Sequence, residues 1–156
     1  MCSTDLLQRL NKIAYFKTKP FCYSCYKVAP TGVCKSCHTD DLMLLLPDSG
    51  CEFGTSWVIT ELTDESLTPV NESELFEQLI DDSYGEEVQV GFMKLSTSQV
   101  MKDQDPVSWE IAQGEYIDGL VQDEELISFD NENTYFWKRD VENYIEEVEL
   151  EMEEAA

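Results

Sequence analysis

Basic residues are scarce in this chain and unevenly placed. Its 156 residues include 10 lysines and arginines against 33 aspartates and glutamates, a formal net charge of −23. Residues 1–40 hold six of the bases and two of the acids, a net charge of +4, whereas residues 41–156 hold four bases and 31 acids, a net charge of −27. A division this sharp predicts two units with different roles.

The chain also lacks a long apolar run. Its longest, Leu42–Leu46, is far shorter than the about 20 residues that span a bilayer. The N-terminus shows no basic segment followed by an apolar one, as a secretory signal would. We therefore expect a cytoplasmic protein with no membrane partner, in a reducing compartment where cysteines serve as metal ligands rather than in disulfides.

Motifs for catalysis are missing as well. The chain has one histidine, His38, no serine or free cysteine in a recognisable nucleophile motif, and no glycine-rich phosphate loop. Carboxylate pairs are so numerous that their presence distinguishes nothing. We expect no enzymatic activity, no catalytic residue and no small-molecule substrate.

Enough apolar residues remain for a folded core, since 42% of the chain is hydrophobic and 11% aromatic. Their spacing predicts an α+β fold. Helices are expected with four inward stripes: Leu6, Leu7, Leu10, Ile13 and Ala14; Leu75, Phe76, Leu79 and Ile80 after an Asn71 cap; Trp109, Ala112, Tyr116 and Leu120 after Asp105-Pro106; and Val141, Tyr144, Ile145, Val148 and Met152. Strands are expected at Leu42–Leu46, Trp57–Thr60 and Val88–Phe92, the last half-buried, and in a hairpin of 126–129 and 134–137 around a four-residue loop.

Two Cys-x-x-Cys pairs form the strongest motif, because eight residues separate Cys22 and Cys25 from Cys34 and Cys37. Each pair can form a tight knuckle, and a turn at residues 29–32 can join them. Four thiolates then reach tetrahedral corners about 2.3 Å from a zinc ion. We predict one structural Zn²⁺ on these cysteines. An iron–sulfur cluster on the same ligands, a thioredoxin-type redox pair and free thiols are the alternatives.

The segment from about residue 20 to residue 46 resembles the zinc-ribbon family, in which two knuckles clamp one structural zinc. The resemblance implies the ligand role for the same four cysteines. The spacer is short for that family, and Tyr26 and His38 stand where a knuckle often has glycine. His38 could replace Cys37 as a ligand, while Cys2 and Cys51 are expected to be buried or free thiols.

These patterns predict two units. Residues 1–46 should form an N-terminal helix and a zinc-ribbon module. Residues 47–156 should form an acidic α+β domain with a short antiparallel sheet and three to four helices. The glutamate-rich segment 149–156 is expected to be a solvated, flexible tail.

Acidic residues recur in clusters on the expected outer faces of helices, where their repulsion costs stability and therefore suggests a use. Duplex DNA carries about one charge per 1.7 Å of axis, so a comparable density of carboxylates can occupy a basic cleft made for nucleic acid. With a pI of about 4.1, this small chain looks like the DNA-mimic inhibitors that phages and plasmids use against restriction and other host defences. We predict that a basic, nucleic-acid-handling protein is bound by Glu72, Glu74, Glu77, Asp81, Asp82, Glu86, Glu87, Asp123, Glu124, Glu125, Glu142 and Glu146.

Other roles compete with mimicry. An adaptor or assembly factor could dock basic proteins through the same acids, and an acidic surface can also serve solubility alone. In the cysteine segment, lysines interleave with Phe21, Tyr23 and Tyr26, a pattern that can bind phosphates and stack bases. The net charge of −27 repels nucleic acid unless the ribbon lies well beyond a Debye length of about 8 Å. We therefore do not expect direct nucleic-acid binding.

Overall fold

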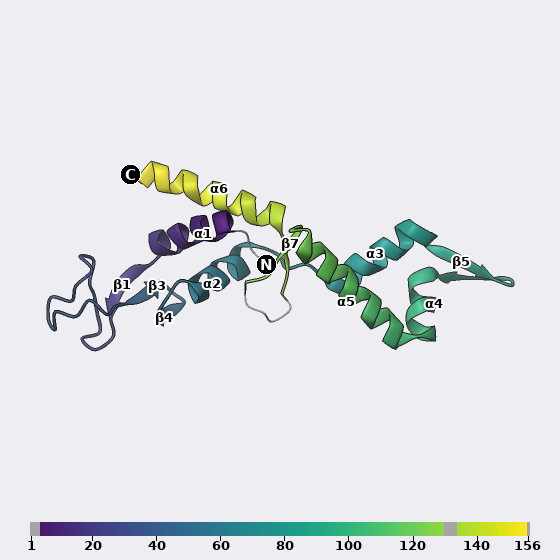
Figure 1. Ribbon diagram of the computed structural model, residues 1–156, viewed down its shortest axis with the longest axis horizontal. Coiled ribbons are helices and arrows are strands. Elements are labelled where there is room, and N and C mark those ends of the chain that lie inside the picture. The colour runs from purple at the N-terminus through teal and green to yellow at the C-terminus, as the bar shows by residue number, and fades with distance from the viewer. Residues whose placement is uncertain (1–3, 130–133, 156) are drawn as a thin grey trace.

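The computed structural model describes residues 4–129 and 134–155, which form six helices and eight strands in an elongated α+β fold (Figure 1). The predicted fold class is therefore confirmed. The helices are α1 (Thr4–Lys17), α2 (Ser56–Ser66), α3 (Glu72–Tyr84), α4 (Thr97–Gln104), α5 (Pro106–Gln122) and α6 (Lys138–Ala155). The strands are β1 (Lys19–Cys22), β2 (Lys27–Val28), β3 (Met43–Leu46), β4 (Gly50–Glu52), β5 (Glu87–Val90), β6 (Met93–Ser96), β7 (Leu126–Ile127) and β8 (Phe136–Trp137).

Helices α1, α2 and α6 lie side by side, although α6 ends the described chain (Figure 1). The predicted stripe of α1 is buried except for Leu7, which is exposed. Each side chain that is fully buried contributes about 1.5–3 kcal/mol. The main core joins residues from both predicted units: Leu6, Leu10, Ile13, Ala14, Leu44 and Leu46 with Val58, Ile59, Leu62, Val141, Tyr144, Ile145 and Val148.

The predicted strand Trp57–Thr60 is wrong, because these residues lie in α2. Val58, Ile59, Leu62 and Thr63 are its buried residues, at helical spacings of three and four. A short run of β-branched residues fits either a strand or a buried helix face, so its periodicity alone could not decide. Packing of these side chains against α1 stabilises the helical conformation.

The glutamate-rich end of the chain is helical in the structure, since α6 extends to Ala155. The predicted inward stripe of α6 is confirmed, with Val141, Tyr144, Ile145 and Val148 buried and Met152 packed against the core. Ion pairs of 2.8 Å join Arg9 Nε to Glu149 Oε1 and Lys17 Nζ to Glu151 Oε2. The expectation of a solvated tail missed these contacts because their partners lie more than 130 residues away.

A four-stranded antiparallel sheet in the order β2-β1-β3-β4 carries the cysteine segment. Residues 43–46 form the predicted strand and pair with β1, so that Leu45 lies opposite Lys19 and Met43 opposite Phe21. Phe21 also pairs with Val28 of β2. The sheet thus connects the cysteine segment to the main core through Leu44 and Leu46.

The other half of the molecule contains α3, α4, α5 and the β5–β6 hairpin (Figure 1). The predicted caps are confirmed: Asn71 Oδ1 accepts a 3.1 Å hydrogen bond from the Glu74 amide, and Asp105 Oδ1 accepts one of 3.0 Å from the Ser108 amide. Phe76, Ile80 and Trp109 form a small core between α3 and α5. A second cluster combines Ile117, Leu120 and Leu126.

Three predictions in this half need correction. Ala112 is exposed, and Ile117 is buried instead, because the apolar face of α5 turns toward β7 along its length. Val88, Val90 and Phe92 are not half-buried but exposed, and Phe92 lies in the turn after β5. The hairpin near the end of the chain exists, but β7 and β8 have two residues each, and its loop at 130–133 lies outside the described residues.

No helix in the described ranges combines the length and apolar character needed to cross a bilayer.

Candidate metal centre

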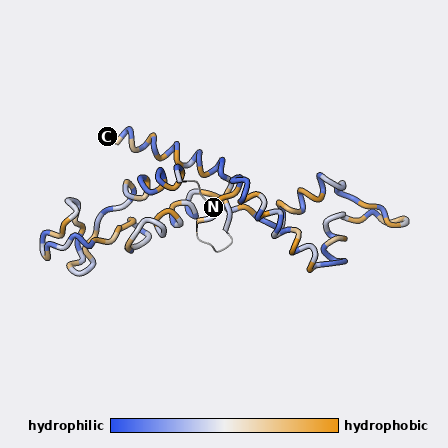
Figure 2. Tube along the Cα trace, viewed as in Figure 1, coloured by the Kyte–Doolittle hydropathy of each residue, from blue (hydrophilic) through white to orange (hydrophobic). Residues whose placement is uncertain are grey.

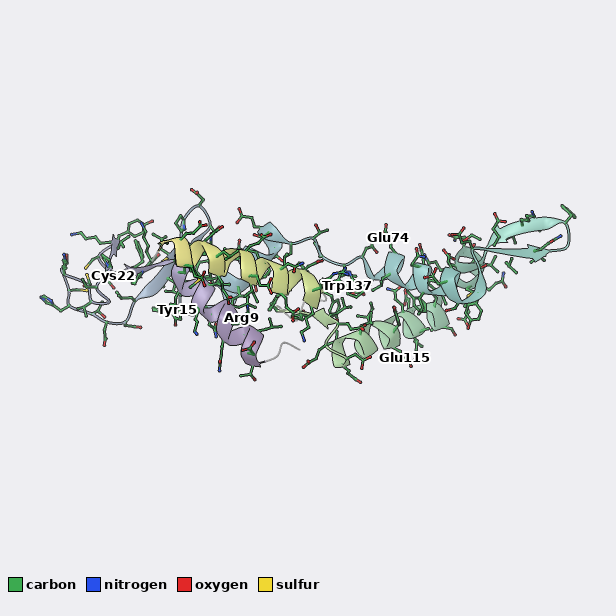
Figure 3. All side chains as sticks on the ribbon, turned by 90° about the horizontal axis from the view of Figure 1, so that it is seen from above. Arg9, Tyr15, Cys22, Glu74, Glu115 and Trp137 are labelled. Carbon is green, nitrogen blue, oxygen red and sulfur yellow. The ribbon has the colours of Figure 1, made fainter. Side chains whose placement is uncertain are left out.

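The four predicted cysteine ligands come together at one end of the elongated molecule, where Figure 3 labels Cys22. Cys22 is the last residue of β1, and Cys25 lies in the turn that leads to β2. Cys34 and Cys37 belong to the segment between β2 and β3. Gly32 donates its amide to the Ala29 carbonyl at 3.0 Å with a φ of 86°, which makes the predicted turn between the two pairs.

The sulfur atoms are spaced as a single metal ion requires. All four Sγ atoms lie within 4.8 Å of one another, and Cys22 Sγ is 3.6 Å from Cys37 Sγ. Tetrahedral thiolates about 2.3 Å from a zinc ion are about 3.8 Å apart, whereas disulfide sulfurs are bonded at about 2 Å. These four cysteines form no disulfide. Their arrangement could therefore hold one metal ion.

Backbone amides favour a thiolate at one corner of this site. Hydrogen bonds from the amides of Cys37 and Ser36 lower the pKa of Cys34 to about 6. The pKa of Cys25 is raised to about 12, mainly by its hydrogen bonds with Cys37 and Cys34 and further by desolvation. Four thiolates this close repel one another, so a bound cation is the natural counter-charge for the set.

Both knuckles share one backbone feature. Tyr26 and His38, each directly after the second cysteine of a pair, have φ values of 56° and 61°. The His38 amide donates to the Cys34 carbonyl at 2.8 Å, which closes the second knuckle. These are the positions where the sequence has a larger residue in place of a knuckle glycine. The left-handed backbone is retained there despite its cost for an L-residue.

The other residues expected as possible sulfur or nitrogen ligands are not part of the described cluster. Among the described residues, the group able to hold a metal consists of the four cysteines, and exposed His38 is not in it. Half-buried Cys51 has its Sγ 3.5 Å from Met43 Sδ and a pKa raised by desolvation. Cys2 lies outside the described residues.

Little apolar packing supports the cysteine segment. Cys22 and Cys34 are 1% and 2% exposed, and Phe21 and Ala29 are the other buried apolar residues between 19 and 42. Phe21 packs edge to face against Tyr26 at 5.2 Å between ring centroids. A module with so small a core needs another source of folding free energy, which metal binding supplies.

The predicted partner-binding acids all retain some exposure. Those exposed are Glu74, Asp82, Glu86, Glu87, Asp123, Glu124, Glu125 and Glu146, and those half-buried are Glu72, Glu77, Asp81 and Glu142. One oxygen of Asp81 is buried and has no hydrogen-bond partner among the described residues, so it cannot face a ligand. Whether the set binds a partner stays a prediction.

The structure brings some of these acids together across distant segments. Lys138 Nζ lies 3.8 Å from Glu124 Oε2 and 3.9 Å from Glu142 Oε1. Trp137 lines both the shallow groove that contains these two glutamates and a second groove bordered by Glu74. Trp137 lies between the two halves of the molecule, with Glu74 and Glu115 on the side away from Cys22 (Figure 3).

Several lysines and arginines are held in local ion pairs. Lys102 pairs with Glu77 from the neighbouring helix and lies 5.2 Å from the Trp109 ring centroid. Arg139 Nε lies 3.9 Å from Asp140 Oδ1. These pairs neutralise only a few acids locally, and the surface of residues 41–156 remains strongly negative.

Comparison with known proteins gives no relative: no family model, curated protein or solved structure matches this chain.

Proposed function

We propose that this chain is a zinc-holding acidic protein that occupies the nucleic-acid-binding surface of a basic partner, as an antirestriction or anti-defence DNA mimic does. The observation that carries the proposal is the position of the acids. Seven of the twelve lie on α3 and α6, whose opposite faces are packed in apolar cores, and the other five lie just after α3 and just after α5. Carboxylates held this way form an ordered array rather than a mobile cloud.

The charge spacing supports mimicry. Five acids of α3 fall between residues 72 and 82, a length of about 15 Å at the helical rise of 1.5 Å per residue. That is about one acid per 3 Å, or about one per 5 Å when paired Glu77 and partly buried Asp81 are left out, against about 3.4 Å between phosphates along one DNA strand. Glu77 is paired with Lys102 and Asp81 is partly buried, so Glu72, Glu74 and Asp82 are the members best placed for contact.

Zinc is the proposed ion, in a site of the zinc-ribbon type. Four thiolates suit zinc, and a site whose four positions are all filled by protein is structural. A cluster of several iron atoms would separate the sulfurs by more than the observed 4.8 Å, because iron and sulfide would lie between them. In this proposal the ion stabilises the cysteine segment and takes no part in partner contact.

The test is competition by DNA. The full chain is immobilised at low salt and exposed to a lysate of its own cell type, and the retained proteins are identified. Mimicry predicts basic, nucleic-acid-binding proteins that duplex DNA releases at an ionic strength where NaCl alone does not. Their affinity should fall by about 10³-fold or more between 50 and 200 mM salt if six or more contacts form.

A matched pair of variants makes the test specific. Glu74→Gln with Glu87→Gln removes two exposed acids of the predicted surface, and Glu110→Gln with Glu115→Gln removes two exposed acids of α5 outside it. Mimicry predicts weaker capture for the first pair and a smaller change for the second. Equal losses, or retained proteins that DNA does not release, would contradict it.

An adaptor that docks basic proteins is the second candidate. The exposed apolar residues of the β5–β6 hairpin favour it, because a phosphate mimic has no need of an apolar surface. Adaptor binding should have a weaker salt dependence and should be insensitive to duplex DNA, so the same experiment separates the two functions.

A further inference from the structure

The β5–β6 hairpin has one apolar face that the described part of the chain leaves mostly uncovered, with Leu95 half-buried. Its register places Val88 opposite Leu95 and Val90 opposite Met93, so these four side chains share one face. Glu87, Gln89, Lys94 and Ser96 share the other. Val88, Val90 and Met93 are 37%, 52% and 47% exposed.

Phe92 extends this apolar surface beyond the strands. It occupies the second position of a two-residue turn after Gly91, whose φ is 62°, and it is 94% exposed. The hairpin projects from the end of the molecule opposite the cysteine segment (Figure 1), and its far end is apolar (Figure 2). Two isolated strands are marginally stable in water, so an apolar face of this kind gains from a covering partner.

The neutral charge of the hairpin indicates which kind of partner can cover its apolar face. Residues 87–96 contain one acid, Glu87, and one base, Lys94, and are therefore neutral within a part of the chain whose net charge is −27. A strongly basic protein would be attracted to the acidic helices rather than to this patch. Two copies of this chain repel one another over their acidic surfaces but not here. Because the hairpin projects from one end of the molecule (Figure 3), contact between two hairpins would keep the acidic bodies apart.

We propose that the apolar face of the β5–β6 hairpin binds the same face of a second copy in a two-fold symmetric dimer. Such an interface uses one patch twice, which a uniformly apolar face permits. The two hairpins would pack as two layers about 10 Å apart, with Phe92 of each covering strand residues of the other. This inference is independent of the proposed mimicry, because it uses none of the predicted partner-binding contacts except the base of the hairpin at Glu87. It assigns the apolar face of the hairpin to a second copy rather than to a partner of an adaptor.

The test is sedimentation of the full chain at about 1–500 μM, since a patch below the standard interface size gives weak association. We expect a monomer–dimer equilibrium that strengthens as NaCl rises, because salt screens the repulsion and leaves the apolar contact. Phe92→Ser should raise the dissociation constant by about tenfold or more. Val90→Thr, which keeps the shape of the side chain, should raise it less.

The control is Leu150→Gln, which removes an apolar side chain of 60% exposure from α6 in the other half of the molecule. It should leave the dissociation constant unchanged, and circular dichroism should show all variants folded. A monomer at every concentration would overturn the proposal. So would equal effects of Phe92→Ser and Leu150→Gln, or association that weakens with salt, as contact between the basic cysteine segment and an acidic helix would.

Discussion

At the scale of single residues, Tyr26 and His38 adopt a backbone conformation that favours glycine. Tyr26 has contacts that offset the cost, since its ring packs on Phe21 at 5.2 Å and on Tyr23 at 6.3 Å. His38 is exposed and has no such ring contact in the described structure. Its left-handed backbone is therefore the less compensated of the two.

His38→Gly is expected to raise the free energy of unfolding of the metal-loaded protein by about 0.5–1 kcal/mol. Removing the conformational cost of a left-handed L-residue stabilises the folded state by about 1–2 kcal/mol. The greater conformational entropy of glycine in the unfolded chain offsets part of this gain. The matched control is Ser36→Gly in the same knuckle, where φ is not positive, and it should destabilise. Urea denaturation measures both, and a loss of stability in both variants would contradict the argument.

Cys34→Ser should abolish metal binding, because it removes a buried ligand. Hydrogen bonds from two backbone amides favour the thiolate form of this cysteine. Elemental analysis of the purified wild-type protein should find about one zinc per chain, and the variant should contain almost none and lose structure in residues 18–42. Cys51→Ser is the control, since Cys51 lies outside the cluster, and it should keep the metal. Equal metal content in the two variants would show that the cluster is not the site.

At the scale of elements, the pairing of α1 with α6 joins the first helix of the described chain to the last. Arg9 donates to both carboxylate oxygens of Glu149, at 2.8 and 3.0 Å, beside the buried stripes of the two helices. This pairing supports the helical conformation of residues 149–155, although four of these seven residues are acidic. The apolar stripe contributes most of the stability, and the ion pair is secondary because both groups are partly exposed.

The contribution of this ion pair should disappear in acid. The hydrogen bond from Arg9 lowers the pKa of Glu149 below its ordinary value of 4.5. A lowered folded-state pKa stabilises the protein above the unfolded-state pKa, and this stability is lost as the pH falls through the folded value. Glu149→Gln should therefore cost up to about 1 kcal/mol near pH 7 and nothing well below pH 4.

Urea denaturation at several pH values measures this difference, with Glu153→Gln as the control. Glu153 is exposed on the same helix, so its neutralisation should only relieve repulsion and leave the protein as stable or slightly more stable at pH 7. If both variants lose stability equally, helix propensity rather than the ion pair would be responsible.

Local patterns predicted the elements that local forces decide. The Asn71 and Asp105 caps, the stripes of α1 and α6 and the cysteine cluster follow from spacing and side-chain chemistry within a few residues. Trp57–Thr60 was assigned to a strand because its side chains suit either element and only contact with α1 favours the helix. The exposure of the β5–β6 hairpin could not be predicted, because alternation marks an amphipathic strand whether or not a partner covers it.

At the scale of the whole molecule, repulsion between the acidic residues destabilises the folded state. Ion pairs such as Lys102 with Glu77 and Arg9 with Glu149 offset it locally, but 33 acids against 10 bases leave a large net repulsion. Most proteins have both signs interspersed on their surface, and added salt then has little net effect on the folded state. Here the repulsion between acids exceeds the attraction of the ion pairs, so added salt should stabilise the folded state.

Stability should therefore rise with ionic strength. Raising NaCl from about 20 mM to about 0.5 M shortens the Debye length several-fold and should raise the melting temperature by about 2–4 °C for each kcal/mol of repulsion removed. Low protein concentration keeps self-association out of the measurement. The Glu110→Gln, Glu115→Gln double variant should start at a higher melting temperature in low salt and respond less to NaCl, since it begins with less repulsion. A melting temperature that falls with salt would mean that attractive pairs outweigh the repulsion, and the acidic helices would then be stabilised by their own surface charges rather than strained by them.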